Sequence, residues 1–193
     1  MAIATAPISS KVKSPSKLAH VVLQTTQLRE MVAYWETFLG AEVIFNNGNL
    51  AFMSYDDEHH RIAMAQAPGV GPRDPRASGL QHIAFTFDNL HDLMLAYRAR
   101  KQHGILPSWS VNHGPTTSLY YRDPDGNAIE TQVDNFENSE DATAFMSSPF
   151  FAQNPIGTDF DPEDLIKRLD NGEDDASIKK RVEIGDRFAP PLF

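Results

Sequence analysis

Two segments of the chain repeat each other at an offset of 62 residues, and this duplication constrains the fold more than any other feature. AHVVLQTTQLREMVAYW (19–35) and QHIAFTFDNLHDLMLAY (81–97) align without gaps. Each contains a His, three apolar residues, a polar turn, and then apolar residues at the i, i+3, i+4, i+7 spacing of an amphipathic helix. A repeat of this kind sets the whole architecture. We therefore predict a strand followed by a helix in each copy.

Short apolar strands follow the helix in both copies. They are expected at 41–45, 49–55 and 60–66 in the first copy, and at 105–111, 116–122 and 127–133 in the second. Good turn formers such as Asn46-Asn47-Gly48 and Pro124-Asp125-Gly126-Asn127 separate them, and a Pro- and Gly-rich linker (68–79) divides the copies. One helix covers only one face of a sheet, so each copy needs a partner. The prediction is an α+β chain whose two βαβββ modules, 17–67 and 80–135, pair into one domain (17–135).

The two ends of the chain do not share the sequence pattern of the repeat. Residues 1–16 have no apolar core and are predicted to be a disordered lead-in. Residues 136–193 are predicted to form a C-terminal arm that lies on the domain or on a partner subunit. Within the arm, 161–169 should form a short helix, because Asp161 suits an N-cap and Asn171-Gly172 a helix end.

Composition excludes several classes of protein. The absence of cysteine rules out disulfides, iron–sulfur clusters and thiol catalysis, and leaves His, Asp and Glu as the strong metal ligands. A net charge of −9 disfavours a nucleic-acid partner. No apolar run reaches the roughly 18 to 20 residues of a membrane helix, and no apolar leader is present at the start. A cytoplasmic protein is expected.

His20 and His82 occupy the same place in the two copies. A single His between apolar neighbours is usually a core residue bonded to a backbone carbonyl. Two at equivalent positions favour a shared site instead, because a pseudo-twofold axis would bring both to the centre of the domain. Glu130 lies in the apolar strand NAIETQV, where an unpaired carboxylate is costly. Two imidazoles and one carboxylate form the facial triad of non-haem iron(II) oxygenases, which leaves positions open for substrate and O₂.

The stretch VNHGPTTSLYYRDPDGNAIE (111–130) matches a known sequence signature at several positions. It is similar to the signature of extradiol ring-cleaving dioxygenases of the vicinal oxygen chelate superfamily, closest to the single-domain type I enzymes of the biphenyl-2,3-diol 1,2-dioxygenase kind. The matching elements are His113, Leu119-Tyr120, Asp123-Pro124-Asp125-Gly126 and Glu130. The resemblance covers about 17–135 and implies a vicinal oxygen chelate domain. It implies cleavage of a catechol by O₂ at Fe(II), or Mn(II), held by His20, His82 and Glu130.

The same resemblance suggests roles for other residues. His60, in EHHRIAM, matches an H-x-x-A context upstream of the second metal ligand and would be the acid–base group. Tyr120 and His113 would hydrogen-bond substrate oxygens. A turn centred near Asp125 should place Tyr120 opposite Glu130, facing the same side. For His59 an exposed turn position without a role stays open, and His91 and His103 are expected to face solvent.

Members of the superfamily with other functions offer alternatives. Glyoxalase-like and epimerase-like members typically take a fourth ligand from the last strand of the first module, where this chain offers only Gln66. An antibiotic-binding member would have no use for a complete triad, but a degenerate member that uses metal only for structure stays open. Many extradiol enzymes have two such domains and this chain has one, so a homo-oligomer is expected. Bicyclic or biaryl catechols are the default substrates.

Overall fold

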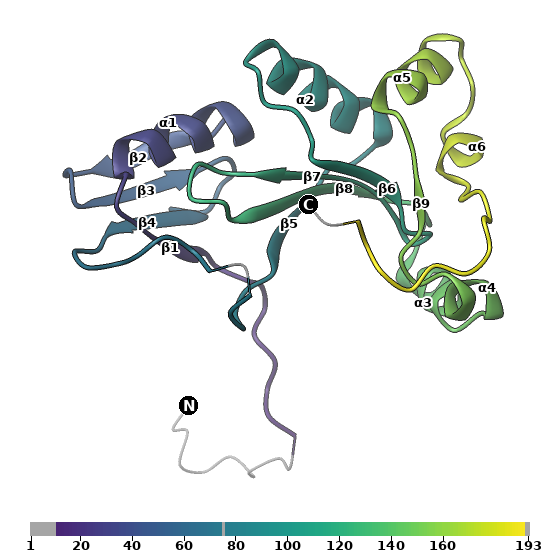
Figure 1. Ribbon diagram of the computed structural model, residues 1–193, viewed down its shortest axis with the longest axis horizontal. Helices are drawn as coiled ribbons and strands as arrows, with labels where there is room; N and C mark the ends of the chain where they lie inside the picture. The colour runs from purple at the N-terminus through teal and green to yellow at the C-terminus, as the bar shows by residue number, and fades with distance from the viewer. Residues whose placement is uncertain (1–10, 75, 192–193) are drawn as a thin grey trace, which may run out of the picture.

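The computed structural model describes residues 11–74 and 76–191, and it contains two sheets that each carry one long helix (Figure 1). The predicted lead-in, 1–16, falls largely outside the described residues. The first module consists of β1 (Val21–Thr25), α1 (Leu28–Leu39), β2 (Glu42–Asn46), β3 (Leu50–Ser54) and β4 (Ile62–Gln66). The second consists of β5 (His82–Thr86), α2 (Leu90–Gln102), β6 (Trp109–Asn112), β7 (Thr116–Arg122) and β8 (Ala128–Asp134). The predicted α+β class and the duplicated βαβββ order are confirmed.

The largest difference between a predicted and an observed strand boundary is at the start of β6. Strand β6 begins at Trp109 and not at residue 105. Pro107, which cannot donate a backbone hydrogen bond, lies in the loop that leads to the strand.

Both sheets share one topology. The strand orders are β1-β4-β3-β2 and β5-β8-β7-β6-β9, and in each module the first strand runs parallel to the last. Val21 pairs with Ile62 in the first sheet, as Ile83 pairs with Ile129 in the second. Strands β1 and β5 are therefore sheet edges, each hydrogen-bonded on one side within the described residues.

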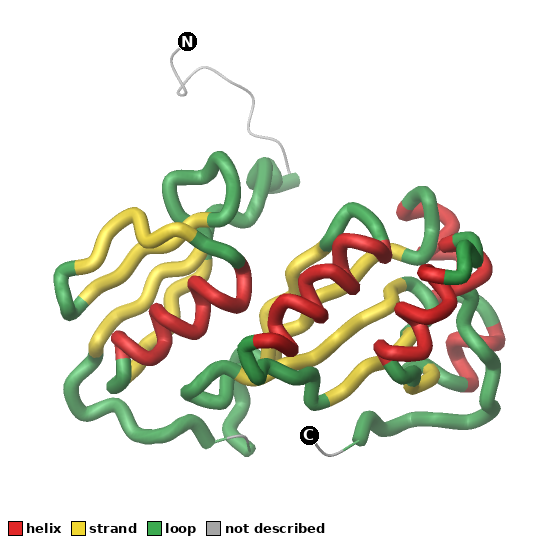
Figure 2. The backbone as a smooth tube through the Cα atoms, turned by 90° about the horizontal axis from the view of Figure 1, so that it is seen from above, coloured by secondary structure: helices red, strands yellow, loops and turns green. Residues whose placement is uncertain are grey.

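Helices α1 and α2 lie on the same side of their sheets (Figures 1 and 2). The apolar stripe of α1 is buried as its spacing predicts, and the helix ends at Gly40, whose φ of 64° suits only glycine well. Helix α2 begins at the N-cap Asn89, which accepts a hydrogen bond from the Asp92 amide. The opposite side of each sheet carries no helix of its own module, and we call it the helix-free face.

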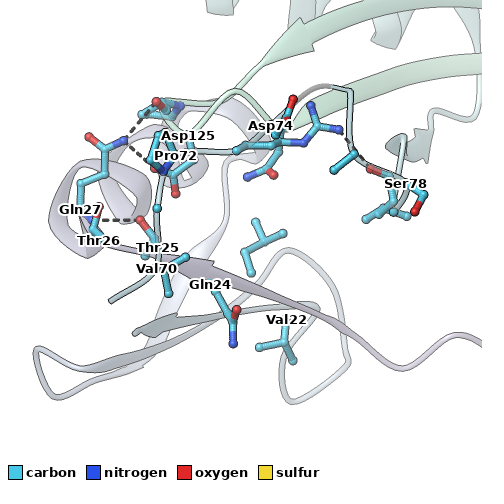
Figure 3. A pocket seen from close by; sticks show the side chains of 18 residues that line it. Val22, Gln24, Thr25, Thr26, Gln27, Val70, Pro72, Asp74, Ser78 and Asp125 are labelled. Atoms are coloured by element: carbon cyan, nitrogen blue, oxygen red, sulfur yellow. Dashed lines mark hydrogen bonds between the residues drawn. The ribbon is translucent and has the colours of Figure 1, made fainter. Parts of the chain in front are cut away.

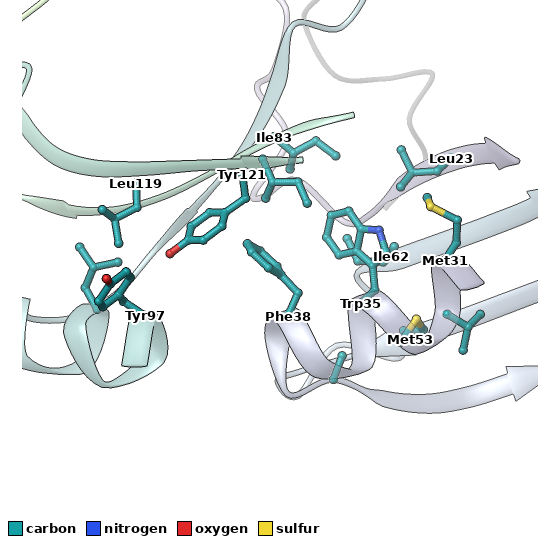
Figure 4. Packing of buried hydrophobic residues seen from close by; sticks show 14 of the residues in the cluster. Leu23, Met31, Trp35, Phe38, Met53, Ile62, Ile83, Tyr97, Leu119 and Tyr121 are labelled. Carbon is teal, nitrogen blue, oxygen red and sulfur yellow. The ribbon is translucent and has the colours of Figure 1, made fainter. Parts of the chain in front are cut away.

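The modules meet through α1. Trp35 and Phe38 project from this helix toward the second sheet (Figure 4). The ring of Trp35 lies 5.9 Å from that of Phe85, and the ring of Phe38 lies 5.0 Å from that of Tyr121. Arg100 of α2 is buried beside them and donates from Nε to the Phe38 carbonyl over 2.8 Å. One apolar core therefore runs through both modules on the helix side.

The C-terminal arm is more ordered than its sequence suggests. It contains α3 (Ser139–Met146), α4 (Pro149–Gln153), β9 (Thr158–Asp159), α5 (Pro162–Asp170) and α6 (Asp175–Lys179). The predicted helix is α5, capped by Asp161 as expected. The arm packs on the second module, where β9 extends the sheet beside β6. Gly157 permits this approach, because a Cβ there would lie 2.2 Å from the Asn112 carbonyl oxygen. No helix in the described part of the chain is long and apolar enough to span a bilayer.

Candidate active site

His82 and Glu130 meet on the helix-free face of the second sheet. The register Ala84↔Glu130 sets the two side chains on neighbouring parallel strands, and His82 Nε2 lies 2.9 Å from Glu130 Oε2. Glu130 is 4% exposed, as the apolar character of its strand indicated. Burial alone would raise the pKa of Glu130, but hydrogen bonds from His82, Ser118 and Tyr120 hold this pKa below its usual value. The carboxylate is thus ionised and directed at the same face as the imidazole.

Tyr120 lies opposite Glu130, which confirms the predicted register across the β7–β8 hairpin. Its hydroxyl lies 3.0 Å from His113 Nε2. Burial, together with the charge of Glu130 and a hydrogen bond to it, raises the pKa of Tyr120 well above its ordinary value. The phenol therefore stays neutral and keeps its proton available for donation.

The tautomer of His113 follows from its partners. Its Nδ1 contacts the carbonyl oxygen of Ile156, which can only accept a hydrogen bond, so Nδ1 carries the proton and Nε2 presents a lone pair to Tyr120. Burial lowers the pKa of His113, although the hydrogen bond to the Ile156 backbone opposes this effect. The ring is therefore neutral near pH 7, and Tyr120 has two possible acceptors, His113 and Glu130, for one proton.

Residues of the arm complete this cluster, and none of them was predicted from the sequence. Besides Ile156, Asp159 accepts a hydrogen bond from Trp109 Nε1 over 2.8 Å, and the Trp109 ring stacks on Tyr120 at 4.9 Å. Arg181 donates from Nη1 to the His113 carbonyl over 3.0 Å. These residues stand in stretches without periodicity, so no local pattern links them to the repeat.

His20 and His60 lie together on the first module. Their ring centroids are 4.4 Å apart, and the His60 ring stacks on Phe52 at 4.8 Å. His59 Nδ1 lies 2.6 Å from His60 Nδ1, which leaves the role of His59 open. Partial burial and the charges of His20 and His59 lower the pKa of His60. His20 is not a core residue despite its apolar neighbours, because it precedes the edge strand β1 and is exposed.

The predicted metal ligands are therefore divided between two clusters. His82 and Glu130 are in contact, whereas His20 lies against His60. Across residues 11–74 and 76–191, no three His, Asp or Glu side chains form a group that could hold a metal ion. Two of the three predicted ligands are thus in contact within the chain, and the assignment of His20, His82 and Glu130 stays a prediction. His91 and His103 are exposed, as expected.

Comparison with known proteins connects this geometry to a family. The model of the Glyoxalase/Bleomycin resistance protein/Dioxygenase superfamily matches residues 17–131, which hold both modules and both clusters. The chain belongs to this superfamily. Its relatives include biphenyl-2,3-diol 1,2-dioxygenase 2 of Rhodococcus globerulus, 46% identical over 81% of this chain and 83% of the relative. Biphenyl-2,3-diol 1,2-dioxygenase 3 of the same organism is 42% identical over 86% of this chain and 88% of the relative.

These alignments change one sequence-based expectation. The resemblance was expected to stop near residue 135, but the match to the first dioxygenase spans 157 residues. Too few residues precede position 17 to account for the difference, so the similarity extends into the arm. Solved superfamily structures share the fold over less of the chain. A glyoxalase/bleomycin resistance protein/dioxygenase domain from Frankia sp. EAN1pec covers 65% of this chain and 96% of its own (TM-score 0.56, 20% identity). A glyoxalase/dioxygenase from Nostoc punctiforme covers 66% and 99% (TM-score 0.53, 20% identity).

Proposed function

We propose that this protein is an extradiol dioxygenase that opens the ring of a catechol-type diol, with biphenyl-2,3-diol as the first substrate to test. The observation that carries the proposal is the contact of Glu130 with both His82 and Tyr120 on one face of the second sheet. A carboxylate and an imidazole are metal ligands of the facial-triad type, and the neutral phenol beside them is a donor suited to a diol oxygen. High identity to two biphenyl-2,3-diol dioxygenases over most of the chain supports the same reaction.

Fe(II) is the proposed cofactor, with Mn(II) as the alternative, and His20, His82 and Glu130 are its proposed ligands. When bound, the metal supplies chelation of the two diol oxygens and a place for O₂. Within one chain, His82 and Glu130 are in contact and His20 lies apart from them. The other proposed roles belong to side chains that would act on the substrate directly.

These side chains have separable tasks. Tyr120 has one hydroxyl proton, which the lone pair of His113 Nε2 accepts over 3.0 Å in the free protein and which a substrate oxygen would accept in its place. A neutral donor of this kind stabilises negative charge that develops on a substrate oxygen. His60 is the proposed acid–base group, because imidazole takes up and returns a proton near neutral pH. The buried rings of Trp109 and Tyr120 supply an apolar wall suited to an aromatic substrate.

The helix-free face of β4 weighs against the glyoxalase-like alternative. Its side chains there, Ala63 and Ala65, offer no metal ligand, and Gln66 Oε1 accepts a hydrogen bond from the Leu28 amide. A fourth protein ligand from this strand, which that alternative requires, is therefore absent.

Oxygen stoichiometry tests the proposal. Protein loaded with Fe(II) without air and then given biphenyl-2,3-diol should consume O₂ and diol in equal amounts and form a ring-opened product with a visible absorption band. Labelled O₂ should leave both of its atoms in the product. A monohydroxylated biphenyl is the matched control, since it cannot chelate, and it should not react. Iron-loaded protein that consumes no O₂ with any catechol of a mono-, bi- and polycyclic panel would refute the proposal.

A further inference from the structure

A hollow of about 450 Å³ lies between the end of the second sheet and the C-terminal arm. Its walls come from the turn after β6, the residues that follow β8, and the helices α3, α4 and α6, and they include Gly114, Phe136, Phe145, Phe150 and Lys179. We call it the arm pocket. None of the residues proposed to act on metal or substrate lines it. It is therefore a cavity separate from the candidate active site, and its volume suits one small organic molecule.

The wall of the arm pocket is aromatic. The ring centroids of Phe136 and Phe145 are 5.7 Å apart, and the Phe145 ring lies 6.0 Å from that of Phe151. Phe150 lines the pocket from α4 and is 58% exposed, so part of its ring surface is free. The Arg181 guanidinium lies 4.9 Å from the centre of the Phe145 ring. Aromatic rings around one cavity favour a ligand with a flat apolar part, because rings pack well against another ring.

The charge of the arm pocket is positive. Its ionisable side chains are Lys179, Lys180, Arg181 and Glu183. Arg181 and Glu183 pair over 2.8 Å, so their charges offset each other. Neither lysine forms an ion pair with any described residue. Two uncompensated ammonium groups beside aromatic rings, in a chain whose net charge is −9, favour a ligand that carries a negative charge.

Another hollow shows the opposite balance of charge. It measures about 780 Å³ and lies between the linker and β1 (Figure 3). Its ionisable side chains are Arg73, Asp74 and Asp125, so the carboxylates outnumber the one guanidinium. Arg73 also donates to the Gly126 and Leu80 carbonyls. This hollow does not favour an anion, so it is charge and not size that distinguishes the arm pocket.

The proposed reaction produces an anion of this kind. Ring opening breaks the carbon–carbon bond beside the diol and forms one new carbon–oxygen bond from O₂ at each of its two carbons. The carbon that carried a hydroxyl becomes a carboxyl group, and its former neighbour becomes a carbonyl. The diol is neutral near pH 7, because phenols titrate near pH 10, whereas a carboxyl group is ionised there. With biphenyl-2,3-diol, a neutral molecule thus becomes a carboxylate that keeps its second ring.

We propose that the arm pocket binds an aromatic carboxylate, and that the ring-opened product of this protein is its ligand. The identity of the ligand rests on the proposed function, and the preference for an aromatic anion rests on the pocket itself. The pocket borders the turn that carries His113. A Cβ on Gly114 would lie 2.2 Å from the Phe145 ring, and Arg181 donates to the His113 carbonyl over 3.0 Å. Product in the pocket therefore touches the groups that hold His113 beside Tyr120.

Binding of biphenyl-4-carboxylate to the full-length protein, measured by calorimetry, tests the charge of the pocket. The protein should bind the neutral biphenyl-4-carboxamide about tenfold more weakly, since the amide loses the attraction of both lysines. A variant with Lys179→Ala and Lys180→Ala should lose about tenfold in affinity for the carboxylate and none for the amide. A variant with Lys11→Ala and Lys13→Ala removes the same charge from exposed positions elsewhere and should bind as the wild type does. Equal affinities for carboxylate and amide, or equal losses in both double variants, would overturn the proposal.

The shape of the pocket gives an independent test. Ala176 lines the pocket from α6 and is exposed, so Ala176→Trp should fill the cavity and abolish binding while the core stays intact. Ala176→Ser is the matched control and should bind the carboxylate normally. Glu130→Gln, in the candidate active site, should also bind it normally. Loss of binding in Glu130→Gln, with full binding by Ala176→Trp, would assign the carboxylate to the active site and overturn the proposal.

Displacement of the probe identifies the ligand. Product formed from biphenyl-2,3-diol by the iron-loaded protein should displace biphenyl-4-carboxylate, and the diol itself should not. A product that leaves the probe bound would overturn its assignment to the arm pocket. A protein that binds the probe in this pocket and opens no catechol would instead refute the proposed function, and the pocket would remain a site for another aromatic carboxylate.

Discussion

The two modules share one scaffold and differ in what they place on it. His20 and His82 hold equivalent positions, and Val22 pairs with Ala63 where its repeat counterpart Ala84 pairs with Glu130. Position 63 is therefore the counterpart of position 130, with a methyl group in place of a carboxylate. The first module offers one predicted ligand and the second offers two. A duplicated fold can thus form an unequal site through a single residue difference at one strand position.

The helix-free faces of the two modules also differ in how far the rest of the chain covers them. On the second sheet the helix-free face is closed, with Trp109 9% and Tyr120 5% exposed, and Ile156 of the arm packs against them. On the first sheet Val22 is 57% and Ile44 54% exposed. No part of the described arm takes the place of Ile156 there. The arm therefore completes the second module and leaves the helix-free face of the first module open.

The largest change in rate is expected at the open module. His60→Ala should bind Fe(II) and diol but turn over roughly 10²- to 10⁴-fold more slowly, because it removes the proposed acid–base group. His91→Ala, an exposed histidine of α2, is the matched control and should keep wild-type kcat. Steady-state rates measured at equal iron content provide the comparison. Equal losses in both variants would remove His60 from the mechanism.

A smaller loss is expected at the closed module. Tyr120→Phe keeps the ring against Trp109 and deletes one donor, so kcat should fall roughly 10- to 1000-fold with iron content unchanged. Tyr121→Phe deletes the neighbouring hydroxyl, which belongs to the opposite, helix-side face, and should leave kcat unchanged. Unaltered kinetics in the first variant would leave the family assignment intact and refute the role given to Tyr120.

Loss of a buried charge in the arm should lower the free energy of unfolding more than loss of an exposed one. The Arg181 side chain is 2% exposed and donates to the His113, Asn154 and Phe150 carbonyls. Arg181→Gln should lower the free energy of unfolding by about 3 kcal/mol, because it leaves buried carbonyls and Glu183 without their partner. Arg168→Gln breaks a solvent-exposed pair with Glu173 and should cost much less, because water screens such pairs. Chemical denaturation measures both, and similar costs would show that the arm does not depend on Arg181.

The smallest effect concerns pH. Burial alone would raise the pKa of Asp159, but hydrogen bonds from Arg187 and Trp109 lower it overall. A lowered carboxyl pKa stabilises the fold above the ordinary value of 3.8 and loses this effect as the pH falls through the folded value. The wild type should therefore exceed Asp159→Asn in stability by up to about 1 kcal/mol at pH 7, a gap that closes in acid. Thermal melts at several pH values measure the gap, and one that widens in acid would contradict the assigned cause.

The repeat made much of this structure predictable. Its spacing indicated α1, α2 and the βαβββ order, and the DPDG turn indicated the register that sets Tyr120 against Glu130. These features arise from local periodicity and turn chemistry. The arm was not predictable in the same way, because Ile156, Asp159 and Arg181 act through single contacts between segments distant in sequence. The exposure of His20 was missed for a related reason: strand order, and not strand sequence, makes β1 an edge.

Iron content of His20→Ala tests the central claim, that both modules supply ligands to one centre. Wild type reconstituted without air should hold about one Fe(II) per chain, and His20→Ala should hold none, as should Glu130→Gln, whose ligand lies in the other module. Thermal melts should first show that both variants are folded. Wild-type iron content in His20→Ala, together with its loss in Glu130→Gln, would contradict the account and confine the centre to the second module.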